Sequence, residues 1–455
     1  MAAPNPINLP PGSKRESRSA TPMRPLDLDL SRADQFRLSF PTPCASPAPC
    51  GLPCDLTLGP ERHAVVNLGH LARMAIMALP QVHGSFHEQA EELFAQIACI
   101  MARQRTPLTA TTMMVFLRDG ADEAEGLKLL QARFGAAMPV VTFVVQPPCG
   151  GAALGVELWA VGGPGVQVER FGPQLLTVAA DGIRWIHCGG VSGEASADDP
   201  HGEALSAFEQ MRTQVAGAGA GFDQVVRTWL YVNQINSGPA GRQRYQELNR
   251  ARTDFFRDIH FGTRSRAASA PATIYPASTG IGTNGDGIRM ACLALDSARP
   301  DVYLLPLENP QQTPACDYQA TYSPQSPKFS RAMAVVQGHF VTTLLSGTAS
   351  ILNSRTCHPG DVIRQTEQTI ENIERLMAPE NFFRHGLTGA GATLRDIAKL
   401  RVYIKHAEDY EKCREVCERC LPNIPALYLH AEVCRPELLM EIEAVAFSPL
   451  AQRQD

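Results

Sequence analysis

Two carboxylates near the C-terminus have the spacing and surroundings for acid catalysis. Glu441 and Glu443 lie in Leu438–Phe447, where alternate residues fall on the same face of a strand. Both faces are mostly apolar, which predicts an interior strand. A carboxylate is costly there unless it is protonated or paired. Glu441 is therefore either a neutral acid held ready for proton transfer or half of a salt bridge.

Other chemically active side chains have simpler interpretations. Cys413, Cys417 and Cys420 recur on one face of a helix, which predicts core packing rather than a metal or redox site. The twelve histidines form no HExxH or comparable pair. We therefore predict no catalytic metal and no cofactor.

A run of glycines superficially suggests a phosphate-binding loop. Its members are Gly280, Gly282, Gly285 and Gly287. They precede a predicted strand rather than a helix, which favours a hairpin turn.

The elements that must position the carboxylates recur three times along the chain. The expected first helices are Glu88–Ala102, Leu205–Gly217 and Gln365–Ala378. The strands expected to follow them are Met113–Leu117, Thr228–Val232 and Leu400–Ile404. The expected second helices are Glu123–Phe134, Arg244–Phe256 and Tyr410–Leu421. The expected closing strands are Val156–Val161, Ile288–Leu295 and Leu439–Phe447.

The spacing of equivalent residues supports this repeat. The step from copy two to copy three is 158 residues for both Glu209 to Glu367 and Gly189 to Gly347. Units of one sheet with helices can each cover the open face of a neighbouring sheet, which predicts a ring of three units with clefts between them. In this alignment the position of Glu441 holds Glu157 in copy one and Met290 in copy two, so one cleft is expected to be active.

Five segments follow from the pattern. Residues 1–58 are rich in Pro, Ser and Arg and are predicted to be a disordered leader. Residues 59–162 form a degenerate first unit, and 163–298 form the second. Residues 299–328 are a predicted linker, and 329–448 form the third unit with the catalytic Glu.

The third copy resembles the YjgF-type reactive-intermediate deaminases. The resemblance lies in Ser346-Gly347, Pro425-Ala426 and the ending Glu441–Ala444. It implies an α+β fold of YjgF/chorismate-mutase-like units, each a mixed sheet covered by two helices. It also implies a pseudo-trimer within one chain, since that family forms homotrimers. Leu427 replaces the arginine that follows Pro-Ala in that family, which disfavours imine hydrolysis.

A longer stretch, roughly residues 165–448, resembles the chorismatase family. The motifs are Arg244–Phe256, Ile274–Gly282, Ser326–Ala332, Ser346–Ile351 and Gln365–Ile373. The resemblance implies an enzyme that removes the enolpyruvyl group of chorismate as pyruvate. Glu441 would protonate the terminal methylene carbon, which requires an un-ionised acid within contact distance.

The family divides by product, and two residues favour one type. The resemblance implies that the aromatising type carries a cysteine seven residues before the catalytic glutamate and a glycine in the Ser-Gly turn. Cys434 and Gly347 occupy these positions, which favours 3-hydroxybenzoate. Formation of 4-hydroxybenzoate as well, or hydrolysis to the dihydroxycyclohexadiene carboxylate, stays open. Without the resemblance, Cys434 reads as a small buried hydrophobe.

A dianionic substrate needs cations. Arg250, Arg252 and Arg331 lie in or beside the family-like motifs, and Arg252 and Arg331 are the preferred carboxylate ligands. Tyr322 is a weaker candidate for a substrate contact, with Tyr318 as its rival.

Composition limits the other possibilities. The net charge of −5 and pI near 6.2 give no reason to expect nucleic acid or a membrane surface as partner. Thirteen cysteines without an export signal predict a reduced, cytoplasmic protein, and the internal repeat allows a monomer. A YjgF-type imine deaminase and a non-catalytic small-acid-binding protein are the alternative functions.

Overall fold

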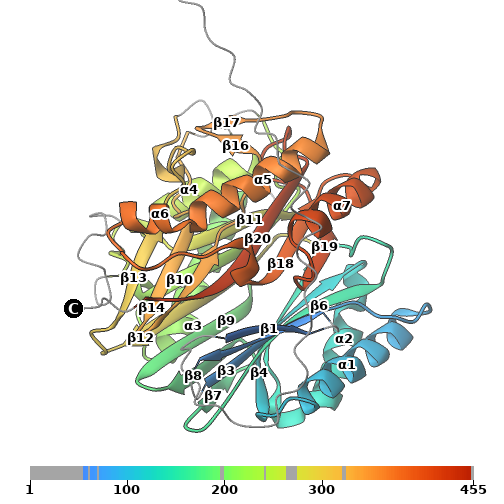
Figure 1. The fold of residues 1–455 in the computed structure, drawn as a ribbon. Helices are drawn as coiled ribbons and strands as arrows, with labels where there is room; N and C mark the ends of the chain where they lie inside the picture. Colours follow the sequence, from blue (N-terminus) through green and yellow to red (C-terminus); the bar gives the residue numbers. More distant parts are fainter. Residues whose placement is uncertain are drawn as a thin grey trace, which may run out of the picture. The chain divides into compact units, whose positions relative to one another are not determined.

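Three six-stranded mixed sheets form the part of the chain that the structure describes (Figure 1). This computed structural model describes residues 55–59, 62–68, 71–194, 199–239, 242–262, 274–319 and 324–451. The sheets follow one another along the sequence, and helices accompany each of them. The predicted α+β fold of three repeated units is confirmed.

The strands of the three sheets follow one plan. The first sheet contains β1 (Asp55–Gly59), β2 (His63–Leu68), β3 (Leu71–Ala78), β4 (Leu108–Leu117), β5 (Val140–Val145) and β6 (Leu154–Gly162). The second contains β7 (Gln167–Gly172), β8 (Leu175–Ala180), β9 (Ile183–Ser192), β10 (Val225–Asn233), β11 (Ala277–Thr283) and β12 (Ile288–Ser297). The third contains β13 (Val302–Leu307), β14 (Ala332–Gln337), β15 (Phe340–Leu345), β18 (Ile397–Ile404), β19 (Ala426–His430) and β20 (Met440–Pro449). A separate two-stranded ribbon pairs β16 (Ile351–Leu352) with β17 (Arg355–Thr356).

Each sheet has its own helices. They are α1 (Phe86–Ala102) and α2 (Glu123–Phe134), α3 (Pro200–Gly217) and α4 (Arg244–Phe256), and α5 (Val362–Met377), α6 (Pro379–Arg384) and α7 (Tyr410–Cys420). Local capping fixes several starts: Ser85 and Glu88 form a capping box on α1, and Asp361 accepts from the Arg364 backbone N–H on α5. Cys413 and Cys417 are buried and pack on the α5 side of α7, as core packing predicted.

The central four strands have the same order in every sheet, namely β3-β6-β4-β5, β9-β12-β10-β11 and β15-β20-β18-β19. In each, the last pair is parallel and the others are antiparallel. A β-bulge also interrupts the same point of β4, β10 and β18. The three units are therefore structural repeats that share both the order of these four strands and the position of this bulge.

Three details differ from the sequence-based expectations. β1 overlaps the end of the predicted leader, whereas residues 1–54 lie outside the described residues. β13 lies within the predicted linker 299–328 and forms the edge of the third sheet. The glycine-rich segment joins β11 to β12, but these strands flank β10 and do not pair, so the predicted hairpin is wrong. A local turn signal fixes a turn but not the order of strands in the sheet.

The predicted equivalence of Glu157 with Glu441 is also wrong. Across the strand pairs, Phe116 faces Gly155, Tyr231 faces Arg289 and Tyr403 faces Glu441. The counterparts of Glu441 are therefore Gly155 and Arg289, while Glu157 corresponds to Glu443. The error is a shift of two residues, which leaves the alternating pattern of a strand unchanged.

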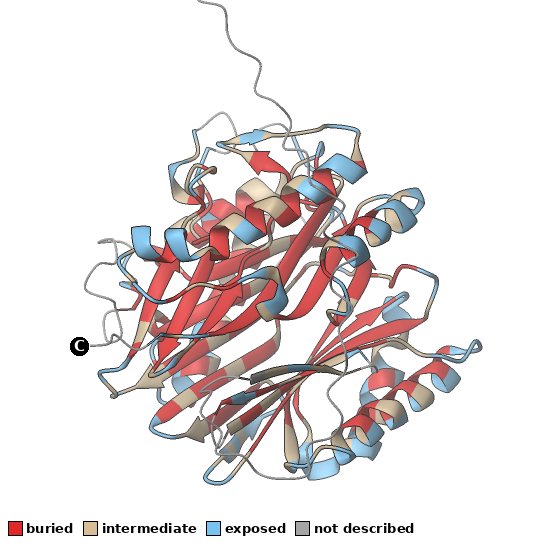
Figure 2. Cartoon of the chain, viewed as in Figure 1, coloured by how far each residue is buried: buried red, intermediate tan, exposed pale blue. Residues whose placement is uncertain are grey.

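The units pack around a pseudo-threefold axis. The parallel edge strand of each sheet lies against the next unit, so that β5 contacts β9, β11 contacts β15 and β19 contacts β3. These three contacts are equivalent by the strand order above. Figure 2 shows that the strands are buried along most of their length, while the helices expose their outer faces.

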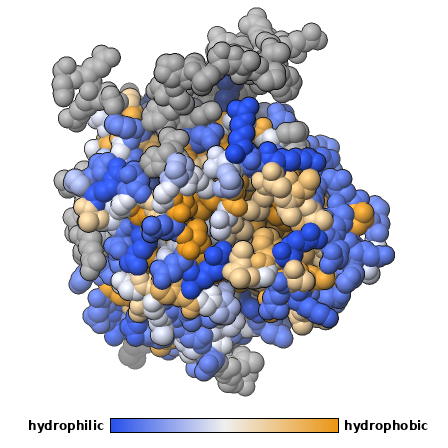
Figure 3. All heavy atoms as spheres, turned by 90° about the horizontal axis from the view of Figure 1, so that it is seen from below, coloured by the Kyte–Doolittle hydropathy of each residue, from blue (hydrophilic) through white to orange (hydrophobic). Residues whose placement is uncertain are grey.

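The outer surface is mostly polar. On the face seen in Figure 3, apolar side chains gather near the middle and polar ones surround them. None of the described helices is long and apolar enough to cross a membrane.

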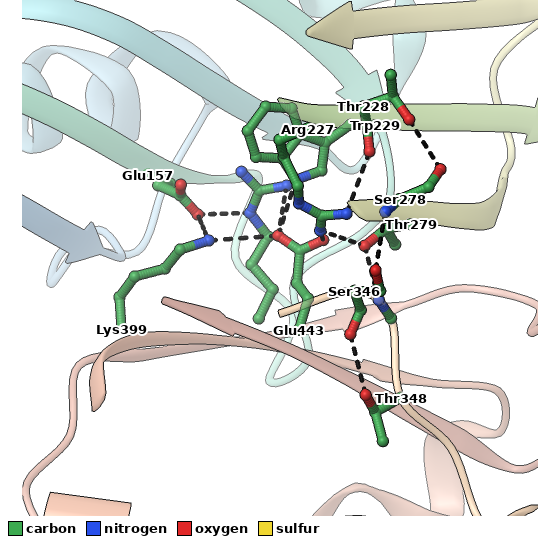
Figure 4. A network of polar contacts seen from close by, with 12 residues as sticks. Glu157, Arg227, Thr228, Trp229, Ser278, Thr279, Ser346, Thr348, Lys399 and Glu443 are labelled. Atoms are coloured by element: carbon green, nitrogen blue, oxygen red, sulfur yellow. Dashed lines mark hydrogen bonds and ion pairs between the residues drawn. The ribbon is translucent and has the colours of Figure 1, made fainter. Parts of the chain in front are cut away.

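A network of buried charges lies where the three units meet (Figure 4). Glu443 is bound by Arg227 (3.0 Å), Lys399 (3.3 Å) and Arg401 (3.1 Å). Glu157 is bound by Lys399 (3.1 Å) and Arg401 (2.5 Å). Burial alone would raise the pKa of both carboxyls, but these cations hold each pKa below its usual value. Three cations therefore face two carboxylates.

Neutral donors complete this central network. The indole N–H groups of Trp159 and Trp229 donate to Glu157 and Glu443 at 2.9 and 3.1 Å. Arg227 also donates to Thr279 Oγ1 at 2.5 Å, and Thr279 Oγ1 accepts from the Gly347 N–H at 3.1 Å. The network thus extends from the axis to the predicted Ser-Gly turn.

Removing one carboxylate from the central network is expected to destabilise the fold. Glu157→Gln leaves Lys399 and Arg401 with an unbalanced buried charge, so the free energy of unfolding should fall by about 3–5 kcal/mol. Urea denaturation followed by circular dichroism measures this. The control is Glu91→Gln, whose half-exposed carboxylate lies 3.6 Å from Arg133 and should change stability by about 0.5 kcal/mol or less. Equal effects of the two substitutions would contradict this account of the network.

Candidate active site

A cavity of about 540 Å³ lies between the second and third units. Its volume is in the range of small-molecule sites. One wall comes from α4 and β11, and the other comes from β20, the Ser346-Gly347 turn after β15, and the loop that precedes β20. This is the interface at which β11 contacts β15. The site therefore belongs to one of the three equivalent interfaces.

The Ser346-Gly347 turn is fixed to the neighbouring unit. Ser346 Oγ donates to the Ser330 carbonyl at 2.6 Å and accepts from the Ser278 N–H at 2.8 Å. A Cβ on Gly347 would collide with the Glu441 carboxyl and approach Thr279 Cγ2 to 3.3 Å. A larger residue here would displace the Glu441 carboxyl, so glycine lets the backbone pass directly over the acid.

Glu441 lies in the interior of β20 and faces the cavity with 4% of its surface exposed. Burial, and next the negative charge of Glu443, raise the pKa of Glu441 to about 8. Its carboxyl has no ion-pair or hydrogen-bond partner among the described residues. Of the two alternatives left by the sequence, the structure supports the neutral acid for Glu441 and the ion pair for Glu443.

Two buried guanidinium groups line the same cavity without a carboxylate partner. Arg252 (2% exposed) donates to Asn249 Oδ1 at 2.6 Å, and Arg331 (3% exposed) donates to the Tyr318 hydroxyl at 2.5 Å. Both lie about 5.5 Å from the Phe329 ring. Neither forms a salt bridge among the described residues, and the Nε atom of each lacks a hydrogen-bond partner there. The buried Glu308 carboxyl attracts Arg331 without forming a salt bridge with it. Two buried guanidinium groups that form no salt bridge among the described residues favour a ligand with two carboxylates.

Cys434 and Tyr245 line the same cavity as the acid and Arg252. Burial, and next the charge of Glu441, raise the pKa of the Cys434 thiol to about 12, so it is protonated at neutral pH. Tyr245 lines the cavity together with Cys434 and Arg252, and burial raises its pKa too. The cavity therefore offers three protonated groups, a carboxylic acid, a thiol and a phenol, beside two guanidinium groups.

Most of the predicted site residues meet in this cavity. Its walls include Glu441, Cys434, Gly347, Arg252 and Arg331. Tyr322 lies outside the described residues, and its rival Tyr318 lines the cavity.

One candidate arginine lies outside the cavity, and two aromatic residues of the cavity were not predicted from the sequence. Arg250 is half-exposed, pairs with Glu247 and does not line the cavity. The sequence did not indicate Tyr245 or Phe329 as site residues, although each lies in one of the family-like motifs. An aromatic residue in such a motif reads first as core packing, so no separate signal marked them.

No metal centre is formed within the described ranges, where no three His, Cys, Asp or Glu side chains gather as ligands would.

Comparisons with known proteins agree with this geometry. The family model "Chorismatase FkbO/Hyg5-like, N-terminal" matches residues 157–294, and the model "Endoribonuclease L-PSP" matches residues 323–448. A 3-hydroxybenzoate synthase of Streptomyces hygroscopicus is 34% identical over 231 residues, and a chorismatase of the same organism is 36% identical over 230. These matches cover 50% of this chain and 64% and 62% of the relatives, less than two thirds of their length.

A solved structure supports the fold. A chorismatase crystal structure superposes with a TM-score of 0.57 and 24% identity, covering 82% of this chain and 98% of that one. The superposed share of this chain is larger than the 50% that the sequence matches cover. The chain therefore contains an FkbO/Hyg5-like chorismatase N-terminal domain followed by an L-PSP domain.

Proposed function

We propose that the protein cleaves chorismate and releases pyruvate and 3-hydroxybenzoate. The observation that carries this proposal is the neutral Glu441 acid in a cavity with two unpaired buried guanidinium groups. Relatives named 3-hydroxybenzoate synthase and chorismatase support it.

The charges and the apolar surface of the cavity favour this substrate. Chorismate carries two carboxylates, and Arg252 and Arg331 supply two buried cations that form no salt bridge among the described residues. The planar Phe329 ring between them offers an apolar surface for the ring of the substrate. Ligand binding would thus neutralise both guanidinium groups.

Glu441 is the proposed proton donor. It transfers its proton to the terminal methylene carbon of the enol ether, and the resulting oxocarbenium ion faces the new carboxylate. Capture by water and cleavage of the ether bond release pyruvate. The low pKa of Glu443 keeps that neighbour ionised, and its charge favours the protonated form of Glu441.

Aromatisation requires loss of one ring hydroxyl as water. The water taken up in releasing pyruvate balances the water lost here, so chorismate equals pyruvate plus hydroxybenzoate in atoms. Cys434 is the proposed positioning residue for this step, because its protonated thiol lies in the cavity wall with Glu441 and Tyr245. A product mixture that includes 4-hydroxybenzoate is compatible with the same site.

Substitution of the proposed acid should remove turnover. Glu441→Gln keeps the shape but cannot protonate carbon, so kcat should fall by roughly 100- to 10,000-fold. Pyruvate release, followed with lactate dehydrogenase and NADH, measures this. Glu437→Gln is the matched control, because Glu437 is an exposed carboxylate in the wall of the same cavity, and its activity should stay within about threefold. A Glu441→Gln variant as active as Glu437→Gln would exclude Glu441 as the acid.

The pH profile should reveal the same group. Because the pKa of Glu441 is raised to about 8, the required acid form predominates below that pH and is lost as the pH rises through it. The value of kcat/KM is therefore expected to fall about tenfold per pH unit above pH 8. Initial rates of pyruvate release between pH 6 and 10 test this. A flat profile up to pH 10 would contradict a neutral carboxylic acid.

The product assignment can be tested separately. Cys434→Ala should shift the products from hydroxybenzoate toward the dihydroxycyclohexadiene carboxylate, with pyruvate release lowered less than tenfold. Liquid chromatography of the ring products gives the ratio. Cys420→Ala, a partly buried thiol on α7, is the control and should keep the ratio of the parent protein. An unchanged ratio in Cys434→Ala would remove Cys434 from this role.

A further inference from the structure

A second cavity lies on the other side of the central network from the active site. It has a volume of about 90 Å³ and takes residues from all three units, including Glu157 and Arg401 of the network. A smaller cavity of about 60 Å³ adjoins it, since the two share Arg73, Trp185 and other residues. None of the residues that line the active-site cavity lines either of them.

The walls of this second cavity are mainly aromatic and aliphatic. All three tryptophans of the chain line it, namely Trp159, Trp185 and Trp229. Val178 lines both the larger and the smaller cavity. Such walls suit a flat apolar ring.

Arg73 is the cation of this cavity that lies outside the central network. It lies on β3, is partly exposed, and has its guanidinium carbon 4.6 Å from the centre of the Trp185 ring. Burial lowers the pKa of Arg73 to about 10, so it stays charged at neutral pH. Its guanidinium group forms no hydrogen bond or ion pair with another described residue.

The nearby carboxylates are already engaged elsewhere. Glu157 is held by Arg401 and Lys399, and Asp181 pairs with Arg299 at 2.6 Å. His187 also lines the cavity, and burial followed by the charge of Arg73 lowers its pKa to about 3, which keeps it neutral. The central network adds an excess positive charge behind the wall, so the cations around this cavity outnumber its carboxylates.

We propose that this second cavity binds a small aromatic monocarboxylate, with its carboxylate on Arg73 and its ring among the tryptophans. A dry cavity of about 150 Å³ is known to hold a benzene ring. The two adjoining cavities, of about 90 and 60 Å³, together offer a comparable volume to a ring that lies across both. The hydroxybenzoate product has this chemistry, and only that identification rests on the proposed function.

The tryptophans provide a direct readout. Benzoate is the probe, because it absorbs little at the excitation wavelength of tryptophan, and it is titrated into the full-length protein while tryptophan emission is recorded. A saturable change in emission is expected, with Kd raised at least tenfold by Arg73→Gln and less by Arg73→Lys, which keeps the charge. Val178→Phe, which fills the cavity, should also weaken benzoate binding. This variant replaces Arg73→Gln as the test if Arg73→Gln does not fold.

Arg331→Gln is the matched control, since it removes an unpaired cation from the other cavity. Its benzoate Kd should stay within threefold of the parent value. Loss of the signal in Arg331→Gln but not in Arg73→Gln would place benzoate in the active site and overturn the proposal, as would the absence of any saturable change.

Turnover separates this proposal from the proposed function. Arg73→Gln should release pyruvate from chorismate at the parent rate, because Arg73 lines only the second cavity and its smaller neighbour. If the parent protein does not consume chorismate, the proposed function is wrong. The benzoate titration still tests whether the second cavity binds an aromatic carboxylate.

Discussion

Glu443 forms ion pairs with three buried cations, and the pair with Arg227 crosses the boundary between two of the repeated units. Arg227 comes from the second unit, Lys399 and Arg401 come from the third, and Glu157 of the first unit binds the same two cations. Burying these charges is costly, so the net contribution of such a network to stability is small while the loss of one member is severe. Every unit must therefore hold its strand in register for the others to be satisfied.

The same network explains how two carboxyls two residues apart acquire opposite protonation states. Glu443 faces the cations and stays ionised, whereas Glu441 faces the cavity with no cation bonded to it. The ionised neighbour then favours the proton on Glu441. Pairs of titratable groups whose surroundings push their pKa values apart are typical of sites that perform acid chemistry near neutral pH.

Hydrophobic periodicity was sufficient to predict the repeated elements. Helices α2 and α4 begin and end at the predicted residues, because their amphipathic patterns stop at clear breaks. Local patterns could not give the sheet order, so the β11–β12 connection was misread. Period-two alternation could not separate Glu441 from Glu443 as the counterpart of Glu157, because both lie on the same face.

Site residues that lie within sequence motifs could be predicted, whereas contacts between residues far apart in the sequence could not. Glu441, Cys434 and Gly347 lie within motifs, and the structure places them in one cavity. That Arg252 and Arg331 lack carboxylate partners depends on the fold, as does the pairing of Arg250 with Glu247. The cavity around Arg73 gave no sequence signal, because its three tryptophans come from three different strands.

Covalent fusion of the three repeats frees each interface to evolve alone. In a homotrimer, any substitution on the axis appears three times, so a ring of identical acids or bases would repel itself. Here the equivalent positions hold Glu157, Ala291 and Glu443 on the closing strands, and Met114, Trp229 and Arg401 on the strands beside them. A single polypeptide can thus assemble a complementary set of charges that no threefold-symmetric assembly could contain, and can reserve one junction for reaction while the others serve different purposes.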